Sequence, residues 1–222
     1  MANASFTRDE VILALDVLYS SGDQRLTAES RAITDLSELL NRLPIHAQSS
    51  RREIFRNPSG VLNQIISFRR SYEKGVKDKN VGAIFYEIAD EYENRHNELH
   101  LISLAIQRNL DLYDNLSFGS DWETNGFPEG ALLGHLHRII EARDYNKVAR
   151  DERCRICGIE TNEVYNCNRN ILTIHLLVPI TDLDAHKRYG ASDYITVCPN
   201  CHEALHAYRP WLGREDYEAI LC

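Results

Sequence analysis

The chain has 222 residues, of which 43% are hydrophobic and 26% are charged, and its formal net charge is −8. These fractions are typical of globular proteins. No stretch is apolar over the length of a membrane span, and the start Met1–Glu10 lacks the basic-then-apolar order of a secretion signal. We therefore expect a cytoplasmic protein, not a membrane protein, with one large or two small domains.

The first 115 residues are predicted to form a compact helical domain. Thr7 and Glu10 have the spacing of a capping box, and apolar residues follow at helical spacing as far as residue 22. A second helix is predicted from about residue 34 to residue 43. A third is predicted over 57–68, where an asparagine followed by a proline supplies the cap and the first turn.

A longer helix is predicted over about Val81–Asn109, packed on the first three. Serine, glycine, asparagine, aspartate and proline are then frequent between Leu116 and Gly130, which indicates a linker. A helical pattern resumes over 131–150. The expected organisation is a helical domain over 1–115, a linker and connecting helix over 116–150, and a third region over 151–222.

Basic charge is concentrated in residues 51–80. This segment holds eight basic and three acidic residues, a net +5, so the rest of the chain carries −13. Together with the three short predicted helices, this segment suits a helix-turn-helix-like domain that reads DNA. A solvated helix face is the alternative explanation of the basic charge. Asparagine and glutamine can pair with adenine edges, but they are also common surface residues, so they indicate base readout only weakly. The candidate DNA contacts are Arg51, Arg52, Arg56, Asn63, Gln64, Arg69 and Arg70.

Four cysteines form two Cys-x-x-Cys pairs, Cys154 with Cys157 and Cys198 with Cys201, around the strand-like run Ile171–Pro179. Each pair places two thiolates one tight turn apart, which suits a tetrahedral zinc ion. A disulfide is the alternative, and the absence of a secretion signal favours zinc. Four thiolates leave no open coordination position, so we expect a structural Zn²⁺.

Three histidines lie close to this pattern. His202 and His206 are four residues apart, so on a helix starting near Asn200 they share one face. His175 lies in an apolar, β-branched run that is typical of a buried strand. The three can surround a second metal ion. The alternatives are ordinary, partly buried histidines, or a histidine that replaces one cysteine on the zinc.

Residues 128–210 resemble the HNH (ββα-metal) endonuclease domain, and in particular the zinc-stapled domains of McrA-like restriction nucleases. The most specific part of the resemblance is the ending Cys-Pro-Asn-Cys-His-x-x-x-His over 198–206. Glu129-Gly130 and the run 137–144 are similar to the segment upstream of such domains. The expected fold class is α+β: a helical N-terminal domain followed by a small zinc-stapled ββα-metal domain.

The resemblance implies roles for five residues. His175, His202 and His206 would hold a catalytic divalent ion, Mg²⁺, Mn²⁺ or another. Asp193 takes the position of the family's asparagine, which steadies the loop. Leu176 takes the position of the histidine that acts as general base. A leucine cannot accept a proton from water, and loss of a general base typically costs about 10²–10⁴-fold in rate.

The function that the resemblance implies is metal-dependent hydrolysis of DNA phosphodiester bonds, of restriction or defence type, with an activity that Leu176 would impair. Three explanations of Leu176 stay open: His186 substitutes as base, the ion activates water slowly, or the chain is inactive. The alternative functions are a non-cleaving DNA-binding protein on the same scaffold and a zinc-stapled protein-interaction module.

The expected partner is double-stranded DNA, with a homodimer as an open alternative to a monomer. The short run Phe55–Val61 is similar to a recognition module attached to many HNH restriction proteins, some relatives of which read methylated or phosphorothioated DNA. Modified DNA is therefore included among the expected partners.

Overall fold

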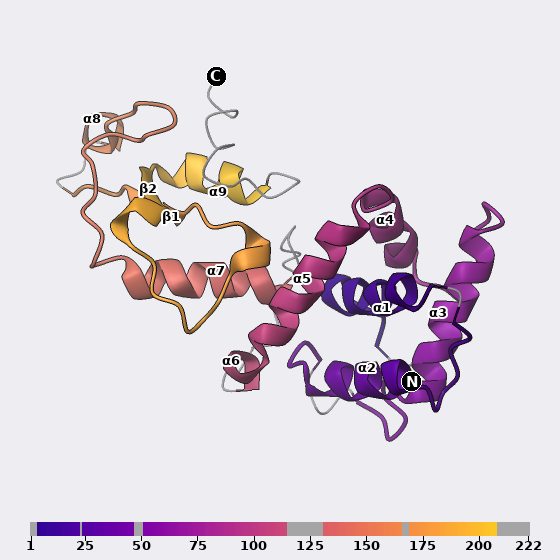
Figure 1. Ribbon diagram of the computed structural model, residues 1–222. Coiled ribbons are helices and arrows are strands. Elements are labelled where there is room, and N and C mark those ends of the chain that lie inside the picture. Colours follow the sequence, from indigo (N-terminus) through magenta and orange to yellow (C-terminus); the bar gives the residue numbers. More distant parts are fainter. Residues whose placement is uncertain (1–3, 23, 47–50, 115–130, 166–168, 208–222) are drawn as a thin grey trace. The chain divides into compact units, whose positions relative to one another are not determined.

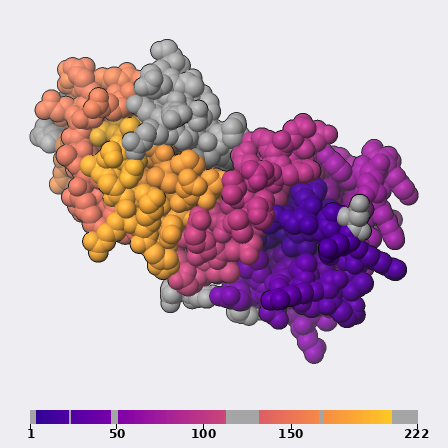
Figure 2. Space-filling view, in the orientation of Figure 1, coloured from indigo at the N-terminus to yellow at the C-terminus, as the bar shows by residue number. Residues whose placement is uncertain are grey.

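The computed structural model describes residues 4–22, 24–46, 51–114, 131–165 and 169–207 (Figure 1). The chain forms two compact units, Met1–Gly126 and Phe127–Cys222. In the space-filling view the first unit runs from indigo to magenta and the second from salmon to yellow (Figure 2). The predicted linker, residues 116–130, lies outside the described residues, as do Cys167 and Cys222.

The N-terminal unit is helical, as predicted. Its helix α1 packs against α2, α3, α4 and α5, and Val11, Ile12 and Leu15 on α1 are fully buried. α1 is therefore the centre of this unit's core. The helices of the unit are α1 (Arg8–Ser21), α2 (Arg31–Arg42), α3 (Pro58–Tyr72), α4 (Ala83–Glu91), α5 (His96–Arg108) and α6 (Leu110–Asp114).

Two of the predicted helix starts are confirmed by their caps. The Thr7 backbone N–H donates to Glu10 Oε2 over 2.8 Å, and Gly22 ends α1 with a φ of 53°, a conformation that glycine adopts readily. At α3 the Asn57 side chain accepts from the backbone N–H of Gly60 over 2.9 Å. The second helix starts at Arg31, earlier than the predicted start near residue 34.

The prediction of one helix over Val81–Asn109 is wrong, because α4 ends at Glu91 and α5 starts at His96. Arg95 stabilises the break. Its guanidinium donates to the Glu91 carbonyl oxygen over 2.8 Å and to the Glu98 carboxylate, in the first turn of α5, over 3.0 Å. One side chain thus caps the end of one helix and joins the start of the next.

The C-terminal unit combines helices with a two-stranded sheet, so the chain is α+β. β1 and β2 are antiparallel, with Thr173 opposite Val197 and Leu176 opposite Tyr194. Both α7 and α9 pack on β1. The elements are α7 (Ala131–Asp144), α8 (Thr161–Tyr165), β1 (Thr173–Leu176), η3 (Ile180–Asp182), η4 (Ala191–Asp193), β2 (Tyr194–Val197) and α9 (Pro199–Ala207).

The predicted strand within Ile171–Pro179 and the predicted helix near Asn200 are both present, as β1 and α9. The connecting helix is shorter than expected. It ends at Asp144, and because it packs on β1 it belongs to the C-terminal unit. Among the described residues, no helix combines the length and the apolar character that a membrane span requires.

Candidate metal centres

The four cysteines of the two pairs come together in the C-terminal unit. The Sγ atoms of Cys154, Cys157, Cys198 and Cys201 lie within 4.8 Å of one another, and the Cys157 and Cys198 sulfurs are 3.8 Å apart. Zinc–sulfur bonds of about 2.3 Å in a tetrahedron place two sulfurs about 3.8 Å apart. A disulfide would require about 2.05 Å. The cluster therefore has the donor atoms and the spacing for one zinc ion.

Backbone geometry holds the two cysteine pairs in place. Gly158 follows the first pair with a φ of 73°, and its N–H donates to the Cys154 carbonyl oxygen over 2.9 Å. Cys201 donates its N–H to Cys198 Sγ over 3.5 Å. Leu172, Val197 and Leu205 form a small apolar core with Cys154 and Cys198. The cluster thus joins the loop before α8 to the start of α9.

The thiols differ in acidity. Burial would raise the pKa of Cys154, but backbone N–H groups of Cys157 and Cys198 lower it to about 7. Burial raises the pKa of Cys201, and the neighbouring Cys198 and Cys157 raise it further. Thiolates this close repel one another, so the full set ionises only around a cation.

A second cluster is formed by β1, α9 and α7. His175 on β1 and both predicted α9 histidines converge, with the His175 ring centroid 5.3 Å from that of His202 and 5.0 Å from that of His206. Two further members, His137 and Glu141, lie four residues apart on α7 and were not among the predicted ligands. Their spacing is the same signal that identified the α9 pair. All five residues are buried.

Glu141 lies at the centre of this histidine–glutamate cluster. Its Oε1 is 3.3 Å from His137 Nδ1 and 3.2 Å from His175 Nδ1. Its Oε2 is 3.1 Å from His202 Nε2 and 3.8 Å from His206 Nε2. The two α9 nitrogens are 3.3 Å apart. Metal–nitrogen bonds of about 2.0–2.1 Å place adjacent donors about 3.0 Å apart in an octahedron and about 3.3 Å apart in a tetrahedron, so these spacings suit one ion.

Burial sets the protonation of the cluster. It lowers the pKa of His137 to about 3 and that of His175 to about 4, so both rings are neutral near pH 7. Burial would raise the pKa of Glu141, but the surrounding histidines hold it well below its usual range. Neutral imidazoles and an ionised carboxylate are the forms that bind a metal ion.

These pKa shifts predict a loss of stability in acid. Between pH 6.5 and about 4 the unfolded chain takes up protons on His137 and His175 that the folded chain does not, so the free energy of unfolding falls as pH falls. Thermal melts of the C-terminal unit at pH 7, 5 and 4 measure this effect. His186→Ala, at an exposed position, should keep the same pH dependence. A melting temperature that is constant over this range would contradict the protonation states.

Leu176 contributes its backbone to the site, whereas the adjacent His175 contributes its side chain. Its side chain is fully buried, so the position at which the resemblance implies a general base holds a core residue. Its backbone serves the cluster instead: the N–H donates to Glu141 Oε1 over 3.0 Å, and the carbonyl oxygen accepts from His137 Nε2 over 2.9 Å. His186, the other candidate base, is exposed in the loop between the strands.

Asp193 holds the loop that leads into β2. Its Oδ2 accepts from the Gly190 backbone N–H over 2.8 Å, and its carbonyl oxygen accepts from Leu177 N–H over 2.8 Å. Asp193 therefore fixes the start of β2 against the end of β1. This is the kind of contact expected of a residue that steadies the loop beside a metal site.

Arg51 and Arg56, two of the predicted DNA contacts, have their guanidinium groups engaged inside the N-terminal unit. Arg56 is buried and ion-paired with Glu10, so it is excluded as a DNA contact. The Arg51 guanidinium donates to the carbonyl oxygens of Asn41, in the last turn of α2, and of Leu43 and His46, which follow it. Of the other predicted contacts, Gln64 is half-buried, whereas Arg52, Asn63, Arg69 and Arg70 are exposed.

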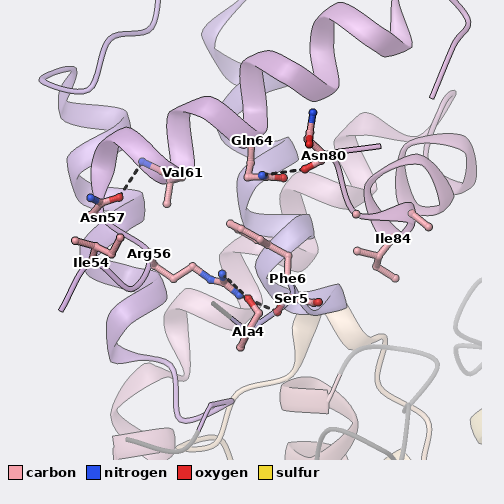
Figure 3. A pocket seen from close by; sticks show the side chains of 13 residues that line it. Ala4, Ser5, Phe6, Ile54, Arg56, Asn57, Val61, Gln64, Asn80 and Ile84 are labelled. Carbon is pink, nitrogen blue, oxygen red and sulfur yellow. Dashed lines mark hydrogen bonds between the residues drawn. The ribbon is translucent and has the colours of Figure 1, made fainter. Parts of the chain in front are cut away.

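Gln64 lines a pocket of about 600 Å³ in the N-terminal unit (Figure 3). Its amide donates to the Asn80 carbonyl oxygen over 3.2 Å. Arg56 also lines the pocket, and its donors are directed to the carbonyl oxygens of Ala4 and Ser5, as Figure 3 shows. These polar groups are therefore engaged within the unit.

Comparison of the chain with protein-family models, with curated proteins and with solved structures gave no match. The two clusters and the basic residues of the segment 51–80 are therefore the features that indicate a function.

Proposed function

We propose that the protein is a metal-dependent DNA endonuclease that hydrolyses phosphodiester bonds. The observation that carries this proposal is the convergence of His175, His202 and His206 on a β-hairpin and helix, directly beside a four-cysteine cluster. The strand–strand–helix order and the placement of each histidine are those that the resemblance to HNH nucleases implies.

The donor set suits the chemistry. A divalent ion bound there supplies charge that stabilises the phosphate oxygens during hydrolysis. The chain supplies imidazoles on β1 and α9, next to the sheet and the cysteine cluster. His202 has a side chain that is 11% exposed, compared with 1% for His175 and 4% for His206. Access for a phosphate is therefore most open at His202.

DNA binding is supported by the exposed basic residues of the segment 51–80. With Arg51 and Arg56 engaged in the fold, six basic side chains stay exposed on α3 and its flanking loops. Such a surface attracts phosphates irrespective of sequence. The six are Arg52, Arg69, Arg70, Lys74, Lys77 and Lys79.

Plasmid cleavage tests the proposed activity. Wild-type protein with Mg²⁺, Mn²⁺, Co²⁺ or Ni²⁺ should nick or linearise the plasmid. His206→Ala, which removes one donor of the ion, should lower the rate by at least about 10²-fold. The control Glu163→Ala removes an exposed side chain of the same unit and should cleave like wild type. Equal rates for His206→Ala and wild type would rule out this site as the source of cleavage.

A non-cleaving DNA-binding protein is the second candidate, and the buried side chain of Leu176 favours it. No proton acceptor is available at that position. The two candidates differ in one measurement: both bind DNA, but only the endonuclease converts supercoiled plasmid in the presence of a divalent ion.

The exposed arginines of α3 give a separate prediction. Arg69→Glu combined with Arg70→Glu should weaken DNA binding and reduce the slope of log affinity against log salt by about two, because fewer counterions are released. Fluorescence anisotropy over a salt series measures both quantities. Arg31→Glu, at a 94% exposed position on α2, is the control for charge alone. An unchanged slope in the double variant would show that this helix face does not contact DNA.

A further inference from the structure

The helix α7 contributes two buried side chains that the three-histidine scheme does not use. His137 and Glu141 are 0% and 6% exposed and lie on the same face of α7. The Leu176 peptide holds both of them. Its carbonyl oxygen is 2.9 Å from His137 Nε2, and its N–H donates to Glu141 Oε1 over 3.0 Å.

The bond to Leu176 fixes the proton on the His137 ring. A carbonyl oxygen only accepts hydrogen bonds, so Nε2 carries the proton and the lone pair of the neutral ring lies on Nδ1. Nδ1 is 3.3 Å from Glu141 Oε1. A nitrogen lone pair and a carboxylate oxygen repel at this distance, and a cation that both can bind removes the repulsion. A ring N–H bound to a backbone carbonyl is also the usual outer contact of a metal-bound histidine.

Two other histidines complete a four-donor set. His175 Nδ1 lies 3.2 Å from the same Glu141 oxygen, and the ring of His206 is centred 5.0 Å from that of His137. The ligand atoms of His137, Glu141, His175 and His206 all lie within 4.8 Å of one another. His202 is adjacent, 3.3 Å from His206 Nε2.

We propose that α7 supplies half of the ligands of the second ion, through His137 Nδ1 and the Glu141 carboxylate, with His175 and His206 as the other half. This inference rests on the proposed function, because it assigns the ion of the same site. Three imidazoles and one carboxylate favour a transition-series divalent ion over Mg²⁺, which prefers oxygen ligands. Four protein ligands leave positions for water and phosphate on an ion with five or six ligands.

Metal titration of the full chain tests the assignment. Protein with zinc in the cysteine cluster is titrated with Co²⁺ by calorimetry and by absorption spectroscopy. Thiolate-to-cobalt charge-transfer bands report any exchange into the cysteine cluster. His137→Gln and Glu141→Gln should each weaken Co²⁺ binding by more than about 10-fold, since even outer contacts of a ligand are worth about 10–100-fold. Mg²⁺ should bind wild type more weakly than Co²⁺ does.

The controls use the same chemical changes at exposed positions. Glu203→Gln on α9, with a 66% exposed side chain, and His186→Gln in the loop should bind Co²⁺ like wild type. Circular dichroism and zinc content establish that each variant is folded. If His137→Gln does not fold, Glu141→Gln alone tests the assignment, because glutamine has nearly the same shape as glutamate and the variant should fold.

The result that would overturn the assignment is unchanged Co²⁺ affinity in both α7 variants while His206→Ala abolishes binding. The three-histidine site, and with it the proposed function, would then stand without α7. If instead both α7 variants lose the ion but the wild type never cleaves DNA, the assignment holds and the endonuclease proposal fails.

Discussion

Cys198→Ser should remove the zinc and unfold the C-terminal unit. The substitution deletes one of four thiolates whose mutual spacing matches a tetrahedral ion. Structural zinc contributes about 10–16 kcal/mol of apparent binding free energy, which far exceeds the stability of a small unit. Loss of the ion also removes the support of α9, and with it the positions of His202 and His206.

Elemental analysis and circular dichroism measure this effect. The wild type should contain about one tightly held zinc per chain, and Cys198→Ser should contain none and lose the signal of the C-terminal unit. The N-terminal unit has its own core and should stay folded. Cys167→Ser is the control, because Cys167 belongs to neither cysteine pair. Wild-type protein that is fully folded and free of zinc would contradict the structural role of the cluster.

Glu10→Gln should destabilise the N-terminal unit by about 3–5 kcal/mol, because it leaves a buried charge without its partner. Arg56 is 5% exposed, and its guanidinium donates to both Glu10 oxygens, over 2.6 and 2.9 Å. His46 Nε2 lies 3.0 Å from the same carboxylate. Burial would raise the pKa of Glu10, but the contacts with His46 and Arg56 lower it. The stabilisation is therefore present at neutral pH and is lost as pH falls below about 4.5.

Urea denaturation followed by circular dichroism gives the change in unfolding free energy. The control is Glu73→Gln, which breaks an exposed ion pair with Arg69. The Arg69 side chain is 45% exposed and the Glu73 side chain is 61% exposed. That change should cost less than about 1 kcal/mol. A double variant, Glu10→Leu with Arg56→Met, removes both charges and should recover much of the loss. If Glu10→Gln and Glu73→Gln have equal effects, the buried pair has no special weight in this unit.

Local signals made much of the fold predictable. Helix caps depend on residues that are close together in the sequence, so these helix ends could be predicted directly. The examples are the N-caps Thr7 and Asn57 and the C-cap Gly22. The break between α4 and α5 could not be predicted in the same way. The apolar spacing continues across it, and the turn depends on hydrogen bonds of Arg95 that form only when both helices are in place.

The cysteines and the α9 histidines of the candidate sites could be predicted, but the α7 residues could not. Cys-x-x-Cys pairs and the α9 histidines are local patterns with known metal-ligand spacing. His137 and Glu141 have equally regular spacing, but their role depends on α7 packing against β1, which is a long-range contact. The burial of Arg56 could not be predicted for the same reason, since its partner Glu10 lies on α1, far away along the chain.

In our proposal, the histidine–glutamate cluster binds a second divalent ion, and this ion enables DNA cleavage. The most direct measurement is titration of Mn²⁺ or Co²⁺ into zinc-containing protein with supercoiled plasmid, following bound metal and nicking together. Nicking should rise with occupancy and saturate at one ion beyond the zinc, and His206→Ala should neither bind this ion nor nick. An ion that fills the site while the plasmid stays supercoiled would contradict the claim.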